Sequence, residues 1–190
     1  MNEPDRRLLI LEAAGRLFRH YGPFKTTVAD IAREARVGVG TVYLEFRTKD
    51  SILGALSSRR HDDVLQAIER AWGDGQPAAE RLAAALTARV DAFFANAEGP
   101  HGADLFDCAC PGVEDAHRSF AQRERNLFTG FLRAAAERGE LRAPEPARDA
   151  HTLLLAYRAF APPAIFQSPR AQVAEELERL HRLVLDGLRT

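Results

Sequence analysis

Six side chains that can bind a metal or take part in catalysis are crowded into residues 101–117. They are His101, Asp104, Asp107, Cys108, Cys110 and His117. Thiolates with imidazoles are a ligand set for soft metals, and a cysteine beside a base can act as a nucleophile. However, their spacing matches no common zinc pattern, and side chains two positions apart on a helix point about 200° from each other. Metal binding and redox sensing stay open, but we expect two ordinary buried cysteines and no metal or other cofactor.

A second group of residues, between 39 and 46, has the chemistry to contact nucleic acid. Val42 and Phe46 are four positions apart, so both can face inward from one short helix. The remaining side chains are small or uncharged, with one hydroxyl and one phenol: Val39, Gly40, Thr41, Tyr43 and Leu44. Such a surface can approach base edges closely and reach a phosphate, whereas a solvated face would prefer charges. The alternative is a helical hairpin that only packs.

Two short helices separated by a tight turn must position this surface. The first begins at Thr27, whose side chain can form a capping box with Asp30. It buries an apolar stripe made of Val28, Ile31, Ala32 and Ala35, and residues 36–38 then interrupt the pattern. A preceding helix, Pro4 to Tyr21, is predicted from inward residues Ile10, Ala14, Leu17, Phe18 and Tyr21. The pattern is that of a helix-turn-helix.

The order of residues through this region resembles the N-terminal signature of the TetR family of bacterial repressors (TetR/AcrR-like). The resemblance covers about residues 8 to 53 and rests on Thr26-Thr27-Val28-Ala29-Asp30-Ile31-Ala32, Val37, Gly40-Thr41-Val42-Tyr43, Phe46, Lys49-Asp50 and Ile52-Leu53. It implies a homodimeric transcriptional regulator that is not an enzyme. Each subunit would have about nine helices, with a head that binds a palindromic double-stranded DNA operator and a body that binds a small-molecule effector.

The resemblance also implies particular DNA contacts. They are phosphates for Thr27, Tyr43 and Lys49, phosphate or base for Thr41, and base edges for Val39, Gly40 and Leu44. Three positions depart from the family pattern: Arg36 replaces a turn glycine, Gly38 replaces a Ser/Thr cap, and Glu45 replaces a common histidine. A positive φ at Arg36 would cost about 1 kcal/mol. Glu45 must either point away from DNA or accept a hydrogen bond from a cytosine amino group.

The rest of the chain also predicts helices, which makes the fold class all-α. The expected ranges are 49–72, 77–96, 105–109, 113–138, 146–160 and 169–188, with Gly and Pro clusters between them. We expect a DNA-binding domain over residues 1–48 and an effector-binding and dimerisation domain over 49–190.

Two residue sets are candidates for the functions of the second domain. An effector pocket needs apolar walls with a few polar groups, and the candidates are Trp72, Phe93, Asn96, Phe106, His117, Phe120, Gln122 and Asn126. The last two long helices can form a four-helix seam with a second copy, through Leu153, Leu154, Tyr157, Leu177, Leu180 and Val184.

Composition adds weak constraints. The formal charge is −1, with nine basic and seven acidic residues in the first fifty positions, which by itself does not indicate nucleic-acid binding. No run is apolar enough for a membrane span and the N-terminus does not resemble a secretory signal, so we expect a cytoplasmic protein with no membrane partner.

We expect a small apolar or amphipathic effector to release the protein from DNA. A thiol- or metal-sensing repressor is the alternative, and a cysteine-dependent enzyme is a distant third.

Overall fold

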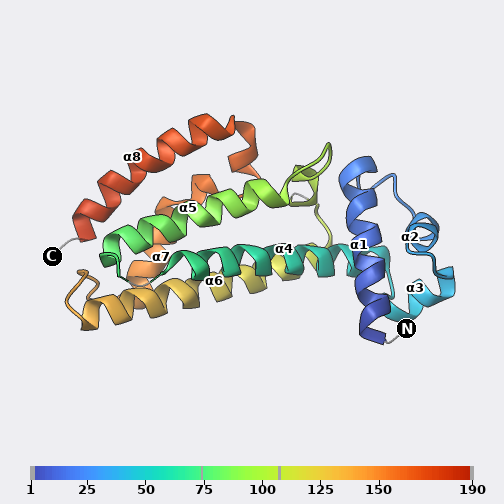
Figure 1. Cartoon of the computed structure of the whole chain (residues 1–190), viewed down its shortest axis with the longest axis horizontal. Helices are drawn as coiled ribbons and strands as arrows, with labels where there is room; N and C mark the ends of the chain where they lie inside the picture. The colour runs from blue at the N-terminus through green and yellow to red at the C-terminus, as the bar shows by residue number, and fades with distance from the viewer. Residues whose placement is uncertain (1–2, 74, 107, 189–190) are drawn as a thin grey trace. The chain divides into compact units, whose positions relative to one another are not determined.

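The fold is described by a computed structural model for residues 3–73, 75–106 and 108–188, and every regular element in these ranges is a helix (Figure 1). The predicted all-α class is confirmed. Eight α-helices and three short 3₁₀ helices are described, where about nine helices were expected. They are α1 Glu3–Tyr21, α2 Val28–Glu34, α3 Val39–Glu45, α4 Lys49–Ala71, α5 Ala78–Asn96, η1 Ala103–Phe106, α6 Pro111–Glu137, α7 Pro146–Ala156, η2 Arg158–Phe160, η3 Ala164–Gln167 and α8 Arg170–Leu188.

Two expected helices differ from those observed. The predicted piece at 105–109 is the 3₁₀ helix η1, which ends at Phe106. The helix predicted over 146–160 stops at Ala156 and continues as η2 before the cis Pro162-Pro163 bond. Proline supplies no N–H and blocks the preceding helical turn, so the α-helix ends ahead of this pair. Tyr21, expected to face inward from α1, is 53% exposed.

By its contacts the chain divides into two compact units, and the predicted functional division at residue 48 stays a prediction. The first contains residues 1–61 and 96–118, and the second contains residues 62–95 and 119–190. The first unit therefore combines α1 to α3 and the first half of α4 with a later segment, which carries η1 and the start of α6.

The first unit has one apolar core. In Figure 1, α1 lies beside α2 and α3, and these three helices contact one another. Ile10, Phe18, Ile31 and Val42 are fully buried there, and the later segment adds the core residues Leu105, Cys108, Cys110 and Val113. Burial of this apolar surface is what holds the helix-turn-helix in place.

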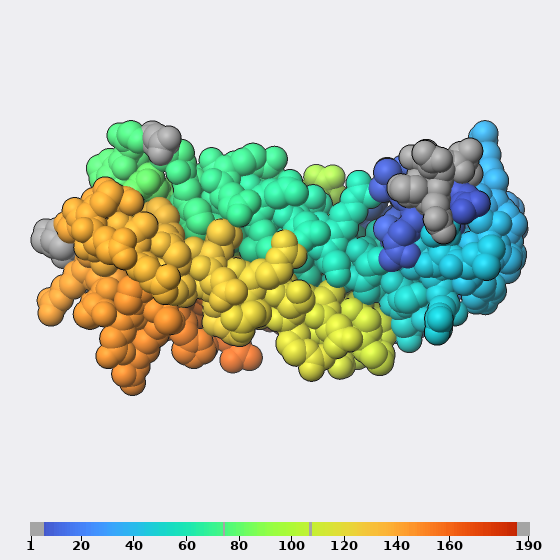
Figure 2. Space-filling model, turned by 90° about the horizontal axis from the view of Figure 1, so that it is seen from below, coloured from blue at the N-terminus to red at the C-terminus, as the bar shows by residue number. Residues whose placement is uncertain are grey.

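The second unit contains the later parts of α4 and α6, nearly all of α5, and α7, η2, η3 and α8. The end of α4 lies beside α6, as Figure 2 shows in teal and yellow to orange, and Asp62 pairs with Arg123 at 2.5 Å. A groove of about 410 Å³ lies there, lined by Asp62, Leu65, Gln66, Glu69, Arg123 and Leu127. On α5, Thr87 and Asp91 contact α8 through His181 and Arg170. The core of this unit is built from large apolar side chains, including Leu82, Leu86, Phe93, Phe128, Leu132 and Ile165.

Candidate nucleic-acid interface

The outward surface of α3 has the orientation that the sequence predicted. Val42 and Phe46 are buried, whereas Val39, Gly40 and Tyr43 are exposed and Thr41 is half-buried. Leu44 is 85% exposed, and with the exposed Val39 and Tyr43 it gives this face of α3 an apolar character. The seven residues of α3 carry one acidic side chain, Glu45, and no basic one.

Glu45 is turned away from this surface. Its carboxylate lies 3.4 Å from Nε of Arg6 on α1, and the side chain is only 10% exposed. Arg7 donates a 2.8 Å hydrogen bond to the Glu45 carbonyl and lies over the Phe46 ring. Of the two possibilities raised by the sequence, the structure shows that Glu45 points elsewhere and joins α3 to α1.

The N-terminus of α2 has the predicted capping box. The Thr27 hydroxyl accepts from the Asp30 N–H at 3.2 Å, and the Thr27 N–H donates to the Asp30 carboxylate at 3.0 Å. The same hydroxyl donates to Asp30 at 2.6 Å. These bonds from Thr27, followed by the charge of Arg33, lower the pKa of Asp30. Because the single hydroxyl proton of Thr27 is already donated, a phosphate contact by this hydroxyl requires it to leave Asp30.

The turn between α2 and α3 places Arg36 in the left-handed region, with a φ of 56°. The Arg36 N–H donates to the Arg33 carbonyl at 3.2 Å, and the Val37 N–H donates to the Ala32 carbonyl at 2.9 Å. This pair of bonds is a Schellman motif, in which glycine is the usual residue at the position of Arg36. Gly38 is the N-cap residue before α3, and no side chain caps the first N–H groups of this helix. The turn therefore keeps its geometry despite both departures from the family pattern.

Lys49, at the first position of α4, has contacts that the sequence did not predict. Its ammonium donates to the carbonyls of Pro23 at 2.9 Å and Thr26 at 3.3 Å. The Thr26 hydroxyl in turn donates to the Gly22 carbonyl at 2.9 Å. Lys49 thus holds the loop before α2 against α4. A lysine has three N–H donors, so a phosphate contact remains compatible with these two bonds.

The comparisons with known proteins agree with this geometry. Residues 10–56 match the family described as bacterial regulatory proteins, tetR family. An HTH-type transcriptional repressor of Mycobacterium tuberculosis is 31% identical, and the match covers 72% of this chain and 80% of the relative. The chain belongs to the TetR family. The match to an HTH-type transcriptional regulator of Bacillus subtilis is 33% identical but spans only 46% of this chain and 46% of that relative.

Solved structures extend the likeness to nearly the whole chain. A TetR/AcrR family regulator from Thermobifida fusca has a TM-score of 0.71 and 26% identity, covering 98% of this chain and 100% of that one. A regulator from Cytophaga hutchinsonii has a TM-score of 0.74 at 21% identity, which shows the fold alone, with coverage of 96% and 98%. Among the residues described, no helix combines the length and apolarity that crossing a membrane requires.

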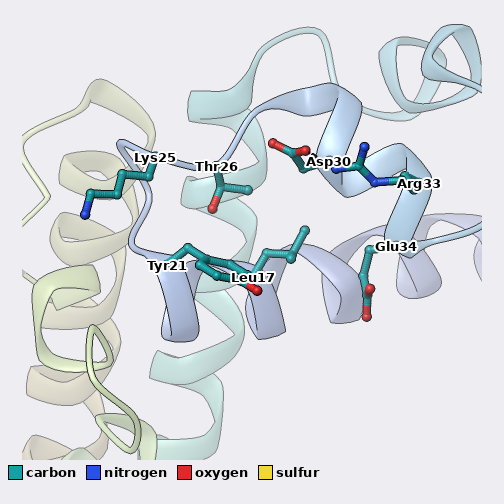
Figure 3. A pocket seen from close by; sticks show the side chains of 7 residues that line it. All are labelled: Leu17, Tyr21, Lys25, Thr26, Asp30, Arg33 and Glu34. Atoms are coloured by element: carbon teal, nitrogen blue, oxygen red, sulfur yellow. Dashed lines mark hydrogen bonds and ion pairs between the residues drawn. The ribbon is translucent and has the colours of Figure 1, made fainter.

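A groove that the sequence did not predict lies between α1 and α2 of this TetR family chain. It has a volume of about 400 Å³ and is drawn in Figure 3 with its lining residues Leu17, Tyr21, Lys25, Thr26, Asp30, Arg33 and Glu34. Its walls carry both charge signs, and Glu34 also pairs with Arg16 at 3.0 Å. The lining comes from three separate segments, so no local spacing could indicate it.

The predicted effector residues are divided between the two units, and their common pocket stays a prediction. Asn96, Phe106 and His117 belong to the first unit, and the other five belong to the second. Within the second unit, the rings of Phe93 and Phe120 meet edge to face, with their centroids 6.0 Å apart. Trp72 instead stacks on Phe131, with a centroid distance of 4.9 Å. Two of the predicted polar residues are exposed and hydrogen-bonded to each other at 2.9 Å: Gln122 and Asn126.

The sequence missed a buried ion pair beside Phe93 and Phe120. Arg89 on α5 lies 2.5 Å from Glu124 on α6, with side chains only 5% and 7% exposed. Arg89 also donates to the Phe160 carbonyl at 3.0 Å and lies over the Phe93 ring. Neither residue belongs to a recognisable motif, and 35 positions separate them. Glu124 follows Phe120 by one helical turn, and that spacing was the only local signal.

The six candidate metal ligands are only partly brought together. Nδ1 of His101 lies 2.7 Å from the Asp104 carboxylate, and the ring centroids of His117 and His61 are 5.1 Å apart. Asp107 lies outside the described residues. No cluster of three or more possible metal ligands occurs where the chain is described. Cys108 and Cys110 are both reduced and buried.

Half of the predicted dimer seam is used within one chain. Leu153, Leu177 and Tyr157 are buried, and Tyr157 is 0% exposed with its hydroxyl 2.7 Å from Nδ1 of His181. Because these three side chains are buried within one chain, they offer little surface to a second copy. The remaining candidates, Leu154, Leu180 and Val184, are half-buried. Leu155 and Leu183, which were not predicted, are 52% and 78% exposed.

Proposed function

We propose that this TetR family chain is a transcriptional repressor that binds a palindromic DNA operator through α3. The observation that carries this proposal is the exposed, nearly uncharged face of α3, fixed from behind by the buried Val42 and Phe46. Val39, Gly40 and Leu44 are then the residues that approach base edges. Tyr43 and Lys49 contact phosphates on either side, with Thr27 and Thr41 adding further contacts. The Mycobacterium tuberculosis relative, named a transcriptional repressor, supports this proposal.

The operator must first be selected from a random DNA pool, in which the proposal expects a palindrome. Replacing Val39 or Thr41 by alanine should then change base preference, by about 1–3 kcal/mol for each good interaction with a base edge that the substitution removes. Tyr43→Phe should weaken binding to all sequences alike. Lys49→Gln should flatten the slope of log affinity against log salt by about 2 for a dimer. Lys49 also holds the 23–26 loop. The circular dichroism spectrum and the unfolding curve of the Lys49→Gln variant therefore serve as a control that the variant is still folded.

The opposing result is equally definite. Unchanged base preference in the Val39 and Thr41 variants, together with wild-type affinity of Tyr43→Phe, would mean that the hairpin only packs. Failure to select any sequence from the pool would reject the repressor itself.

We also propose that the protein acts as a homodimer through the outer faces of α7 and α8. Exposed leucines are costly to leave in water, and Leu155 and Leu183 are exposed on these two helices. Leu183→Arg should give a monomer in sedimentation, because an arginine cannot be buried without a partner. Leu8→Arg, at an exposed leucine of α1, is the matched control and should remain dimeric. A dimeric Leu183→Arg would contradict this assignment.

The effector, on this proposal, is a small amphipathic molecule that enters between α5 and α6. Support comes from the contact of Phe93 and Phe120 beside the buried Arg89–Glu124 pair, since apolar walls with a few polar groups suit an amphipathic molecule. The transcriptional regulator FadR from Bacillus subtilis, which has the same fold, was solved in complex with stearoyl-CoA. Stearate and stearoyl-CoA are therefore the first probes for release of the operator, and Phe120→Trp should block the response by filling the site. An unchanged response in this variant would place the effector elsewhere.

A further inference from the structure

Cys108 and Cys110 lie side by side, contrary to the divergent arrangement expected of a helix. Residues 108–110 are not helical, and the Cys110 N–H donates to the Cys108 carbonyl at 3.0 Å, which makes a tight bend. Both side chains enter the same apolar cluster and are 8% exposed. The neighbouring Cys110 also helps to raise the pKa of Cys108, as expected of two adjacent thiols. The separation of about 200° assumed from helical spacing therefore does not apply.

The start of α6, directly after the two thiols, is pressed against the first turns of α4. A Cβ added at Gly112 would meet the Asp50 carbonyl oxygen at 2.7 Å, and one added at Gly54 would meet the Gly112 carbonyl oxygen at 2.8 Å. Backbone thus lies on backbone, and no space between them is left to absorb added volume. This part of α4 begins with Lys49, which holds the loop leading into the helix-turn-helix. Any expansion at the thiols must therefore displace either the bend or the start of α4.

The chemistry of the pair favours one kind of reagent. Burial, with the neighbouring Cys110, raises the pKa of Cys108 to about 11, so little of the Cys108 thiolate exists at neutral pH. Peroxides and alkylating agents react with the thiolate and should react slowly at Cys108. A trivalent arsenical instead condenses with two neutral thiols: two As–S bonds form, and both S–H protons leave with the arsenic-bound oxygen as water. No electrons are transferred, so no oxidant is needed.

We propose that Cys108 and Cys110 form a dithiol site for trivalent arsenicals, and that filling this site weakens operator binding. The second clause rests on the proposed repressor function. An arsenic atom with its substituent adds volume to a packed cluster whose α4 side is blocked by Gly54 and Gly112. Overpacking a core of this kind typically shifts side chains and backbone. We expect affinity for the selected operator to fall by about tenfold or more.

The test uses phenylarsine oxide on the full chain. The folded wild type should gain the mass of one phenylarsine oxide less one water, and 2,3-dimercaptopropanol should reverse this gain. Cys108→Ala and Cys110→Ala each keep one thiol and serve as matched controls. Both should bind the operator like the wild type, form no adduct that survives dilution and show no response to the reagent.

Three results would overturn the proposal. An adduct on urea-unfolded but not on folded protein would mean that the buried pair is closed to the reagent. Stable adducts on either single-cysteine variant would mean that the two thiols do not act together. A stoichiometric adduct with unchanged operator affinity would remove the coupling to DNA. If the wild type selects no DNA, the repressor function fails, while the mass and reversal measurements still decide whether the dithiol site exists.

Discussion

Arg36→Gly should make the protein more stable, although it removes a long side chain. Arg36 has a φ of 56° in the turn that closes α2. A residue with a Cβ is destabilised in this conformation by about 1–2 kcal/mol. Glycine relieves that strain but gains freedom in the unfolded chain, which offsets about 0.4–1 kcal/mol. The balance is a gain of about 0.5–1 kcal/mol in the free energy of unfolding.

Urea unfolding followed by circular dichroism measures this change. The transition midpoint should rise without a change in the m-value, because the surface exposed on unfolding is nearly the same. Arg36→Ala is the control: it shortens the side chain but keeps the Cβ, so it should stay within about 0.5 kcal/mol of the wild type. An alanine variant as stable as the glycine variant would assign the effect to the guanidinium and refute the strain argument. A glycine variant less stable than the wild type would refute it as well.

Three further predictions concern single side chains. Glu124→Gln should lower the free energy of unfolding by about 3 kcal/mol because it leaves the Arg89 charge buried, and adding Arg89→Met should restore most of the loss; additive losses in the double variant would contradict this. Burial lowers the pKa of His181 below its ordinary 6.5, so the unfolded chain takes up this proton first. The stability that His181 contributes is therefore full above 6.5 and is lost as the pH falls toward its folded pKa. An equal pH dependence of unfolding in His181→Gln and wild type, from about pH 7.5 to about 5, would show that His181 does not contribute. Finally, Glu45→Ala should cost at most about 1 kcal/mol, since its partner is partly exposed, and should leave base preference unchanged, unlike substitution of Val39; a changed preference would place Glu45 in the groove.

Local patterns predicted the helix-turn-helix well because its determinants are close in sequence. The Thr27 and Asp30 cap, the inward pair Val42 and Phe46, and the turn at Arg36 all depend on residues within a few positions of one another. Hydrophobic periodicity alone fixes which face of such a short helix is buried. The positions of these residues in the structure agree with those expectations.

Contacts between distant segments could not be predicted in the same way. Lys49 bonds to carbonyls 26 and 23 positions earlier, and Arg89 finds Glu124 across two helices. Periodicity shows that α7 and α8 have apolar faces, but it does not distinguish a face packed inside the chain from one left for a second copy. Tyr157 was therefore assigned to the seam, whereas its hydroxyl is bonded to His181 in the interior.

The DNA-binding head is also not one continuous piece of chain, and this affects how the protein is made. Leu105, Cys108 and Val113 complete the core around α1 to α3, although they follow it by more than fifty residues. A ribosome adds about 5–20 residues per second and releases the N-terminus first. During synthesis, α1 to α3 therefore leave the ribosome with part of their apolar surface uncovered, and this surface stays uncovered until the segment near residue 113 has been released. Closing so long a loop slows folding relative to a contiguous helical domain. A fragment that ends at residue 48 keeps every proposed DNA contact except Lys49 but lacks this later part of the core, so it should still bind the hydrophobic dye ANS after refolding, whereas the refolded full chain should not.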